Sequence, residues 1–120
     1  MTAADRPVAP EPRRALTTTV RWTPVDDGVR LDGEVDASNA SILAEIVALE
    51  RLRHGGHVRL ELEGLSFMDG AGVRALLSIA RDLREDGGLL VLVSPGYIVR
   101  KALSVLTPEE LLDSIRIVGS

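Results

Sequence analysis

Several residue types are scarce or missing in this chain of 120 residues: it has no cysteine, a single lysine, and one residue each of Trp, Tyr and Phe. Without cysteine the protein has no disulfide bonds, thiolate nucleophiles or cysteine-based zinc sites, which fits a reducing cytoplasm. The few aromatic rings leave no platform on which nucleic-acid bases would stack. The formal net charge of −4 argues the same way, because phosphate binding depends on clustered Lys and Arg. We therefore expect no nucleic-acid partner.

Long apolar runs are also missing, since no stretch approaches the roughly 20 apolar residues that a membrane-spanning helix requires. We expect a cytoplasmic protein with no direct membrane insertion. The segment from Met1 to Pro12 is polar, holds three of the six prolines and lacks the apolar core of a signal peptide. These features predict a disordered tail over residues 1–15 and a single domain over residues 16–120, a normal length for one core.

Catalytic patterns are missing as well. The sequence contains no Ser-His-acid set with a supporting motif, no group of four metal ligands and no phosphate-binding loop with its lysine. His54 and His57 flank a Gly-Gly break, but no third ligand stands at a suitable spacing. We therefore expect no enzyme activity, no cofactor and no metal.

The strand patterns predict an N-terminal β-hairpin followed by parallel strands. An Asp26-Asp27-Gly28 turn signal separates a β-branched run over Thr17–Trp22 from an alternating run over Val29–Val35. Charged residues alternate with apolar ones there and again in His57–Glu63, so one face of the sheet is expected to contact water. The continuous apolar run Leu89–Val93 indicates a more deeply buried parallel strand.

Helical patterns separate these strands. Asp36 and Ser38 are expected caps of a first helix, which ends before Gly55-Gly56 and has its apolar stripe at Ile42, Leu43, Ile46, Val47 and Leu49. A central helix is predicted from Gly70 to Asp86, with Leu76 and Leu77 facing the core and Arg74, Ser78, Arg81, Asp82 and Glu85 facing water.

The C-terminal part has weaker signals. Ser94 is an expected N-cap, followed by Pro95 in the first turn of a helix that ends near Val105. Thr107-Pro108-Glu109-Glu110 resembles a capping box that opens a short helix. The final run Ile115–Val118 is compatible with a strand or an apolar flap.

Alternation of helix and strand predicts an α/β fold with right-handed crossovers that advance across the sheet in one direction, giving the order 1-2-3-4 with helices mainly on one face. The loops after the second, third and fourth strands are then expected at one edge, where parallel sheets usually bind ligands. These loops are Asp36–Asn39, Phe67–Gly72 and Ser94–Tyr97.

The start of the central helix is the strongest candidate site. A helix that begins at Asp69 or Gly70 is expected to present unpaired N–H groups and a partial positive charge, which suit an anion or a partner's carboxylate. Gly70, Ala71 and Gly72 carry no reactive side chain, so this segment is more typical of a docking surface than of a catalytic centre. Asp69 also has a purely structural interpretation as a helix N-cap, and the glycines as residues of a tight turn.

The run Leu60–Asp69, followed by small residues and a leucine-rich helix, resembles the STAS domain of anti-sigma factor antagonists. Leu31–Asp36 and the Gly87-Gly88 pair before Leu89–Pro95 support the resemblance, which covers roughly Thr17–Val118. It implies a two-layer fold with a mixed sheet of four to five strands, and a bacterial protein that acts in transcription regulation by partner switching. Such domains bind a kinase-type anti-sigma factor and are turned off when a Ser or Thr beside the motif's Asp is phosphorylated.

This chain departs from that pattern because the residue after Asp69 is Gly70, which has no hydroxyl. We therefore expect a monomer or weak dimer that binds an anti-sigma factor or related kinase without the usual phosphoswitch. Two alternatives stay open: a module that senses a nucleotide or another anion, and an accessory subunit of a lipid-transport complex. The expected partner-binding residues are Asp36, Ser38, Asp69, Gly70, Ala71, Gly72, Arg74 and Ser94.

Overall fold

The fold consists of five strands, three α-helices and one short 3₁₀ helix, in a computed structural model that describes residues 19–119 without the side chains of residues 110–112. The predicted tail over residues 1–15 lies outside the described residues. In chain order the elements are β1 (Val20–Val25), β2 (Gly28–Val35), α1 (Ile42–His54), β3 (His57–Met68), α2 (Gly70–Glu85), β4 (Leu89–Val93), α3 (Tyr97–Leu106), η2 (Glu109–Ser114) and β5 (Ile115–Val118).

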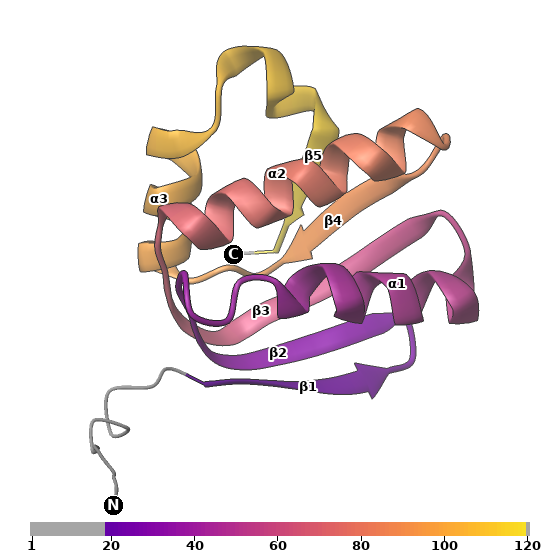
Figure 1. Cartoon of the computed structure of the whole chain (residues 1–120), viewed down its shortest axis with the longest axis horizontal. Helices are drawn as coiled ribbons and strands as arrows, with labels where there is room; N and C mark the ends of the chain where they lie inside the picture. The colour runs from indigo at the N-terminus through magenta and orange to yellow at the C-terminus, as the bar shows by residue number, and fades with distance from the viewer. Residues whose placement is uncertain (1–18, 120) are drawn as a thin grey trace, which may run out of the picture.

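The strands form one mixed sheet whose spatial order, β1-β2-β3-β4-β5, is the same as their order in the chain (Figure 1). β1 and β2 pair antiparallel as the predicted hairpin, and Val25 pairs with Gly28 across the two-residue turn at Asp26-Asp27. The other pairs are parallel. The predicted order of the first four strands is confirmed, and the C-terminal run forms a fifth strand.

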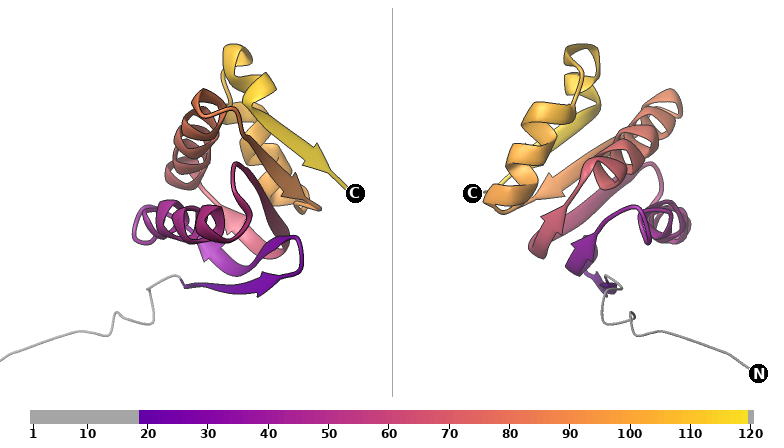
Figure 2. Two further views of the ribbon diagram at one scale, coloured as in Figure 1. Left: turned by 90° about the vertical axis from the view of Figure 1, so that its right-hand side faces the viewer. Right: turned by 60° about the vertical axis from the view of Figure 1, so that its left-hand side comes forward.

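The core lies on the face of the sheet that the helices cover. Figure 1 shows α1 and α2 in front of the strands, and Figure 2 shows the same two helices on one side of the sheet. Val99 and Leu103 of α3 belong to the same buried cluster. Its other large members include Leu31, Leu43, Ile46, Leu60, Leu62, Leu76, Leu83, Leu90 and Leu92. A sheet with helices mainly on one face is thus confirmed.

Helix α1 differs from its prediction at both the start and the buried stripe. It begins at Ile42 after Ser41, whose side chain makes no capping hydrogen bond. Asp36 and Ser38 lie in a separate turn before the helix, so their prediction as caps was wrong. Leu49, predicted in the apolar stripe, is 55% exposed, whereas Glu50 is only 1% exposed. Glu50 can be buried because Arg53 Nη1 lies 2.8 Å from its Oε1 and His54 Nδ1 lies 2.5 Å from its Oε2.

Helix α3 begins two residues later than predicted, at Tyr97, and Ser94 does not cap it. Ser94 has a positive φ of 52° and donates its backbone N–H to the Val118 carbonyl at 2.8 Å, which ties it to the end of β5. The capping box predicted at Thr107–Glu110 also differs. Thr107 closes α3, and η2 begins after Pro108 without a side-chain cap.

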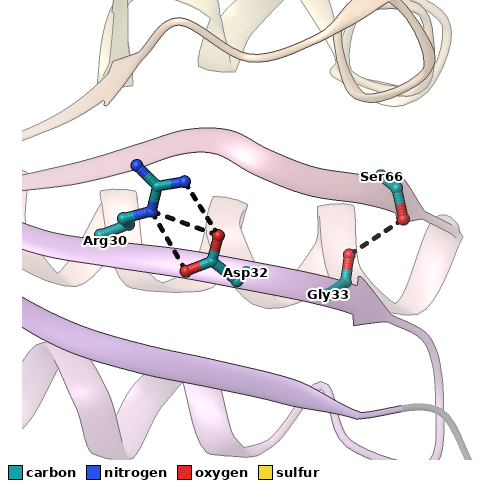
Figure 3. Close-up of polar contacts among 4 residues, drawn as sticks. All are labelled: Arg30, Asp32, Gly33 and Ser66. Atoms are coloured by element: carbon teal, nitrogen blue, oxygen red, sulfur yellow. Dashed lines mark hydrogen bonds and ion pairs between the residues drawn. The ribbon is translucent and has the colours of Figure 1, made fainter.

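The face of the sheet opposite the core carries charged side chains, as the alternation predicted. Arg30 of β2 binds the Asp32 carboxylate through Nε at 3.2 and 3.1 Å and through Nη2 at 3.1 Å (Figure 3). This hydrogen bond, together with the attraction of opposite charges, lowers the pKa of Asp32. Farther along, Ser66 Oγ donates to the Gly33 carbonyl at 3.2 Å and joins β3 to β2 (Figure 3).

Strand β3 extends well beyond β4. Val93, the last residue of β4, pairs with Glu61, whereas Val35 at the end of β2 pairs with Met68, seven residues farther along β3. At about 3.3 Å per residue, β3 therefore continues roughly 23 Å past the end of β4. Helix α3 contacts both β3 and α2, and lies at the end of the sheet where α2 begins (Figure 1).

Candidate functional site

The first turn of α2 is closed by Asp69. Its Oδ1 accepts hydrogen bonds from the N–H groups of Ala71 at 2.9 Å and Gly72 at 3.2 Å. The Asp69 carbonyl also accepts the N–H of Val73 at 3.0 Å. Asp69 is thus the helix N-cap, and the expectation of unpaired N–H groups was wrong for these positions. Because the capping group is itself a carboxylate, this turn does not favour a bound anion.

The two glycines of this turn have different surroundings. Gly72 is buried, and a Cβ there would lie 2.5 Å from Met68 Cγ and 3.0 Å from Val35 Cγ1. Gly72 therefore lets the helix pack directly on the ends of β2 and β3. Gly70 is half-buried, and its nearest neighbour is the end of the flexible Arg74 side chain, with Nη1 3.1 Å from an ideal Cβ. A side chain at Gly70 would point to the surface, where the Arg74 guanidinium lies.

The loop after β2 lies next to this turn. The Asp69 N–H donates to the Val35 carbonyl at 3.2 Å and so joins the two loops. Within the loop, Asp36 Oδ1 accepts hydrogen bonds from the Ser38 N–H at 2.8 Å and from Ser38 Oγ at 2.6 Å. Asn39 Oδ1 accepts the Asp36 N–H at 2.9 Å. These bonds fix the loop beside the start of α2.

Ser94 does not belong to the same site. It follows Val93, which pairs with Glu61, so it lies far back along β3 from Asp69. The structure brings together the predicted residues Asp36, Ser38, Asp69, Gly70, Ala71, Gly72 and Arg74, and separates Ser94 from them. The three predicted loops follow parallel strands, but the unequal strand lengths stagger them.

Exposed apolar side chains on β3 and α3 were not among the predicted partner-binding residues. Phe67 at the end of β3 is 42% exposed, and Tyr97 and Ile98 at the start of α3 are 73% and 49% exposed. Leu106 at the end of α3 is 46% exposed and lies 3.8 Å from the ideal Cβ position of Gly70. The sequence held one signal: two of its three aromatic residues, Phe67 and Tyr97, lie in loops that were predicted to follow parallel strands.

Ionisable groups elsewhere in the described part do not gather into a metal site. Within residues 19–119 no group of three or more His, Cys, Asp or Glu side chains is arranged to hold a metal ion. His54 is engaged with Glu50, and His57 is exposed at the start of β3. None of the helices in the described part has the length and apolar character to cross a membrane.

The sequence was compared with models of known protein families and with curated protein sequences. The sequence profile of the family described as "Mlab, STAS domain" matches residues 18–113. Among curated protein sequences, none matches the chain.

Solved structures share the fold. The anti-sigma factor antagonist of Mycobacterium paratuberculosis superposes with a TM-score of 0.65 at 17% identity, covering 87% of each chain. A candidate anti-sigma factor antagonist from Thermotoga maritima gives a TM-score of 0.64 at 24% identity, covering 84% of this chain and 86% of that one. Unphosphorylated SpoIIAA of Bacillus gives 0.62 at 23% identity, covering 85% and 90%. At these identities the structural similarity shows a common fold.

Proposed function

The chain belongs to the STAS domain family, and on this premise we propose that it is a non-catalytic protein-interaction module that binds an anti-sigma factor or a related kinase-type regulator. The proposed contact surface consists of the first turn of α2 and the adjoining Asp36–Asn39 loop. Both segments lie at the ends of parallel strands, and the hydrogen bond from Asp69 to Val35 holds them side by side. Similar solved proteins are described as anti-sigma factor antagonists, which supports this class of partner.

One observation carries the proposal. Gly70 follows the capping residue Asp69, and a side chain at this position would point to the surface. The family resemblance places a phosphorylated hydroxyl here. A phosphate added there would bring about two negative charges beside Asp69. Because Gly70 cannot accept a phosphate, we infer that the module binds its partner without this switch.

Four serines of the described part are candidates for a substitute hydroxyl, and each stands at another position than Gly70. Ser66 lies within β3 and donates its Oγ to the Gly33 carbonyl. Ser78 lies eight residues after Gly70, about two turns along α2. Ser38 is bonded to Asp36, and Ser94 lies near β5. None of these four serines stands directly after the capping carboxylate, as a hydroxyl at Gly70 would.

The test places a charge at this surface. Gly70→Asp is expected to weaken binding of a kinase-type anti-sigma factor from the same organism by about tenfold or more, because the new carboxylate would stand beside Asp69 and next to the Arg74 guanidinium, and so would make the contact surface more negative. Gly70→Asn is the matched neutral control and should bind nearly as well as wild type. Affinities are measured by calorimetry after circular dichroism has shown that each variant is folded.

Phosphate incorporation completes the test. With partner and ATP, Gly70→Ser is expected to bind its partner and to become a kinase substrate, while wild type incorporates no phosphate at this turn. Equal affinity of wild type and Gly70→Asp would place the interface elsewhere. Stoichiometric phosphorylation of wild type would show that a switch exists at another residue.

A second candidate function is that of an accessory subunit in a lipid-transport complex. One observation favours it: the matching family profile is described as "Mlab, STAS domain" and not as an anti-sigma factor antagonist. Purification of the complex from native membranes and cytosol separates the two functions. A co-purifying transporter ATPase supports the second, and a kinase-type regulator supports the first.

A further inference from the structure

A groove between α2 and the end of α3 adjoins the proposed contact surface. Its volume is about 450 Å³, and Gly70, Leu77, Leu106 and Pro108 are among the residues that line it. Leu77 is buried at 6% exposure and forms part of the floor, while Leu106 is 46% exposed at the side. The groove thus offers an apolar strip next to the start of α2.

Two arginines line the same groove. Arg74 and Arg81 both come from the exposed side of α2 and are seven residues apart, which places them about 10.5 Å apart along the helix axis. Leu77 stands between them in the sequence. The positive charges therefore flank the apolar strip along the direction of α2.

Arg74 and Arg81 have no acidic partner in the described part of the chain, and they are the two arginines that line this groove. Arg30, Arg51 and Arg53 each form an ion pair, with Asp32, Asp86 and Glu50 respectively. Arg84 instead donates to Ser114 Oγ at 3.4 Å. For Arg74 and Arg81 the structure gives neither an ion pair nor a hydrogen bond within residues 19–119. An exposed pair of this kind, beside an apolar strip, is complementary to an acidic amphipathic segment.

A second groove, between α3 and β5, is less suited to such a segment. It is larger, about 560 Å³, and Lys101 and Arg100 line it together with Ile115 and Ile117. The Arg100 guanidinium, however, already donates to the carbonyls of Pro95 at 3.1 Å and Gly119 at 3.0 Å. Lys101 then remains as a single cation, without a second at a matching distance.

We propose that the groove between α2 and α3 binds an acidic amphipathic helix of the partner protein. This helix carries two carboxylate residues seven positions apart, which pair with Arg74 and Arg81. Apolar residues three and four positions after the first carboxylate residue contact Leu77 and Leu106. The spacing matches because side chains seven residues apart lie on the same face of a helix. The inference rests on the proposed function, since it gives the chemistry of a partner that binds beside the first turn of α2.

The first test uses synthetic peptides as probes. A helical peptide with Glu at two positions seven apart and Leu at the third and fourth positions after the first Glu is titrated into the ¹⁵N-labelled full chain. A matched peptide with Gln in place of both Glu residues is the control. We expect the amide chemical-shift changes to concentrate at Arg74, Leu77, Arg81 and Leu106. The Gln peptide should bind at least about tenfold more weakly than the Glu peptide, and added salt should weaken the binding of the Glu peptide. Equal binding of both peptides, or shifts confined to β5 and Lys101, overturns the inference.

The second test reverses the charges on the protein. Arg74→Glu combined with Arg81→Glu is expected to weaken binding of the Glu peptide at least about tenfold. Arg21→Glu combined with Arg116→Glu changes the net charge by the same amount on exposed strand positions outside the groove, and is expected to leave binding unchanged. Unaltered binding by the Arg74 and Arg81 variant overturns the inference.

The two proposals can fail separately. If Gly70→Asp weakens binding of the natural partner while charge reversal at Arg74 and Arg81 does not, the proposed function stands and the groove inference fails. If the peptide binds in the groove, and a natural partner depends on Arg74 and Arg81 but is not an anti-sigma factor or related regulator, the groove inference stands and the proposed function fails.

Discussion

Helices α1 and α2 contact each other on the same face of the sheet, but they begin and bury their residues in different ways. The N-terminus of α2 is capped by the Asp69 side chain, and its buried residues are all small or apolar. The N-terminus of α1 has no side-chain cap, and α1 buries Glu50 while Leu49 and Leu52 face solvent. The start and the buried face of α2 thus follow from its capping residue and its apolar pattern, whereas the apolar pattern of α1 does not give its buried face. The proposed contact surface includes the capped start of α2.

The largest expected difference between the two helices concerns leucine. Leu76 of α2 is fully buried at 0% exposure, so Leu76→Ala should lower the free energy of unfolding by roughly 2 to 5 kcal/mol. Leu49→Ala, on the exposed side of α1, should change it by less than about 0.5 kcal/mol. Urea unfolding at neutral pH measures both, with Arg81→Ala as a further surface control. Equal losses for the two leucines would contradict the assigned orientation of the helices.

The buried carboxylate of α1 provides the next difference. Replacing both partners of Glu50, by Arg53→Ala and His54→Ala together, leaves a buried acceptor without these bonds and should cost roughly 1 to 3 kcal/mol. Arg51→Ala is the control, because its partner Asp86 has a side chain that is 60% exposed, and such pairs contribute about 0 to 1 kcal/mol. Thermal and urea unfolding of the variants measure the difference. If the Arg51 variant loses as much stability as the double variant, the Glu50 cluster is not stabilising.

The caps are expected to differ by a smaller amount. Asp69→Ala removes two hydrogen bonds to the first turn of α2 and should cost about 0.5 to 2 kcal/mol. Ser41→Ala, at the corresponding position of α1, removes no capping bond and should leave stability within about 0.5 kcal/mol of wild type. Hydrogen exchange of the Ala71 and Gly72 amides provides a local readout, since both should exchange faster in Asp69→Ala. Unchanged exchange there would contradict the role of Asp69 as the cap.

The smallest effect is expected for an exposed ion pair, in contrast to the buried cluster of α1. Arg30 lowers the pKa of Asp32 chiefly through a side-chain hydrogen bond. A depressed pKa in the folded state means that the carboxylate adds stability above its unfolded pKa, and that this contribution is lost as the pH falls through the folded pKa. The NMR titration of the Asp32 carboxyl carbon should therefore show a rise in its pKa in Arg30→Gln. A pKa that is the same in both proteins would show that the ion pair does not form in solution.

Much of the fold could be predicted because the signals are local. The Asp-Gly turn, the alternation in β2 and β3, and the capped start of α2 each depend on residues close together in the sequence. The failures have two kinds of cause. Glu50 is buried because Arg53 and His54 of the same helix satisfy its oxygens, a local polar arrangement that an apolar pattern does not reveal. Ser94 has the sequence of a cap, but its N–H bonds to β5.

The residues at the start of α2 could be predicted from the sequence, whereas the position of Ser94 and the groove beside α3 could not. Asp69, Gly70 and Gly72 follow directly from the strand-to-helix junction. Ser94 was assigned to the same place because the sequence does not give the relative lengths of β3 and β4, and the stagger between them moves Ser94 away. The groove at Arg74 and Arg81 depends on where α3 ends beside α2, which is a tertiary relation that no single segment encodes.

The order of the strands in the sheet has a consequence for synthesis on the ribosome. Each strand from β2 to β5 pairs with the strand that immediately precedes it in the chain, so every strand finds its partner already synthesised when it leaves the exit tunnel. The second edge of each inner strand stays open only until the next strand in the chain has been synthesised, which limits the time in which that edge is exposed to other chains. We therefore expect the sheet to grow from β1 toward β5 in the direction of translation, with the Ile115–Val118 strand added last.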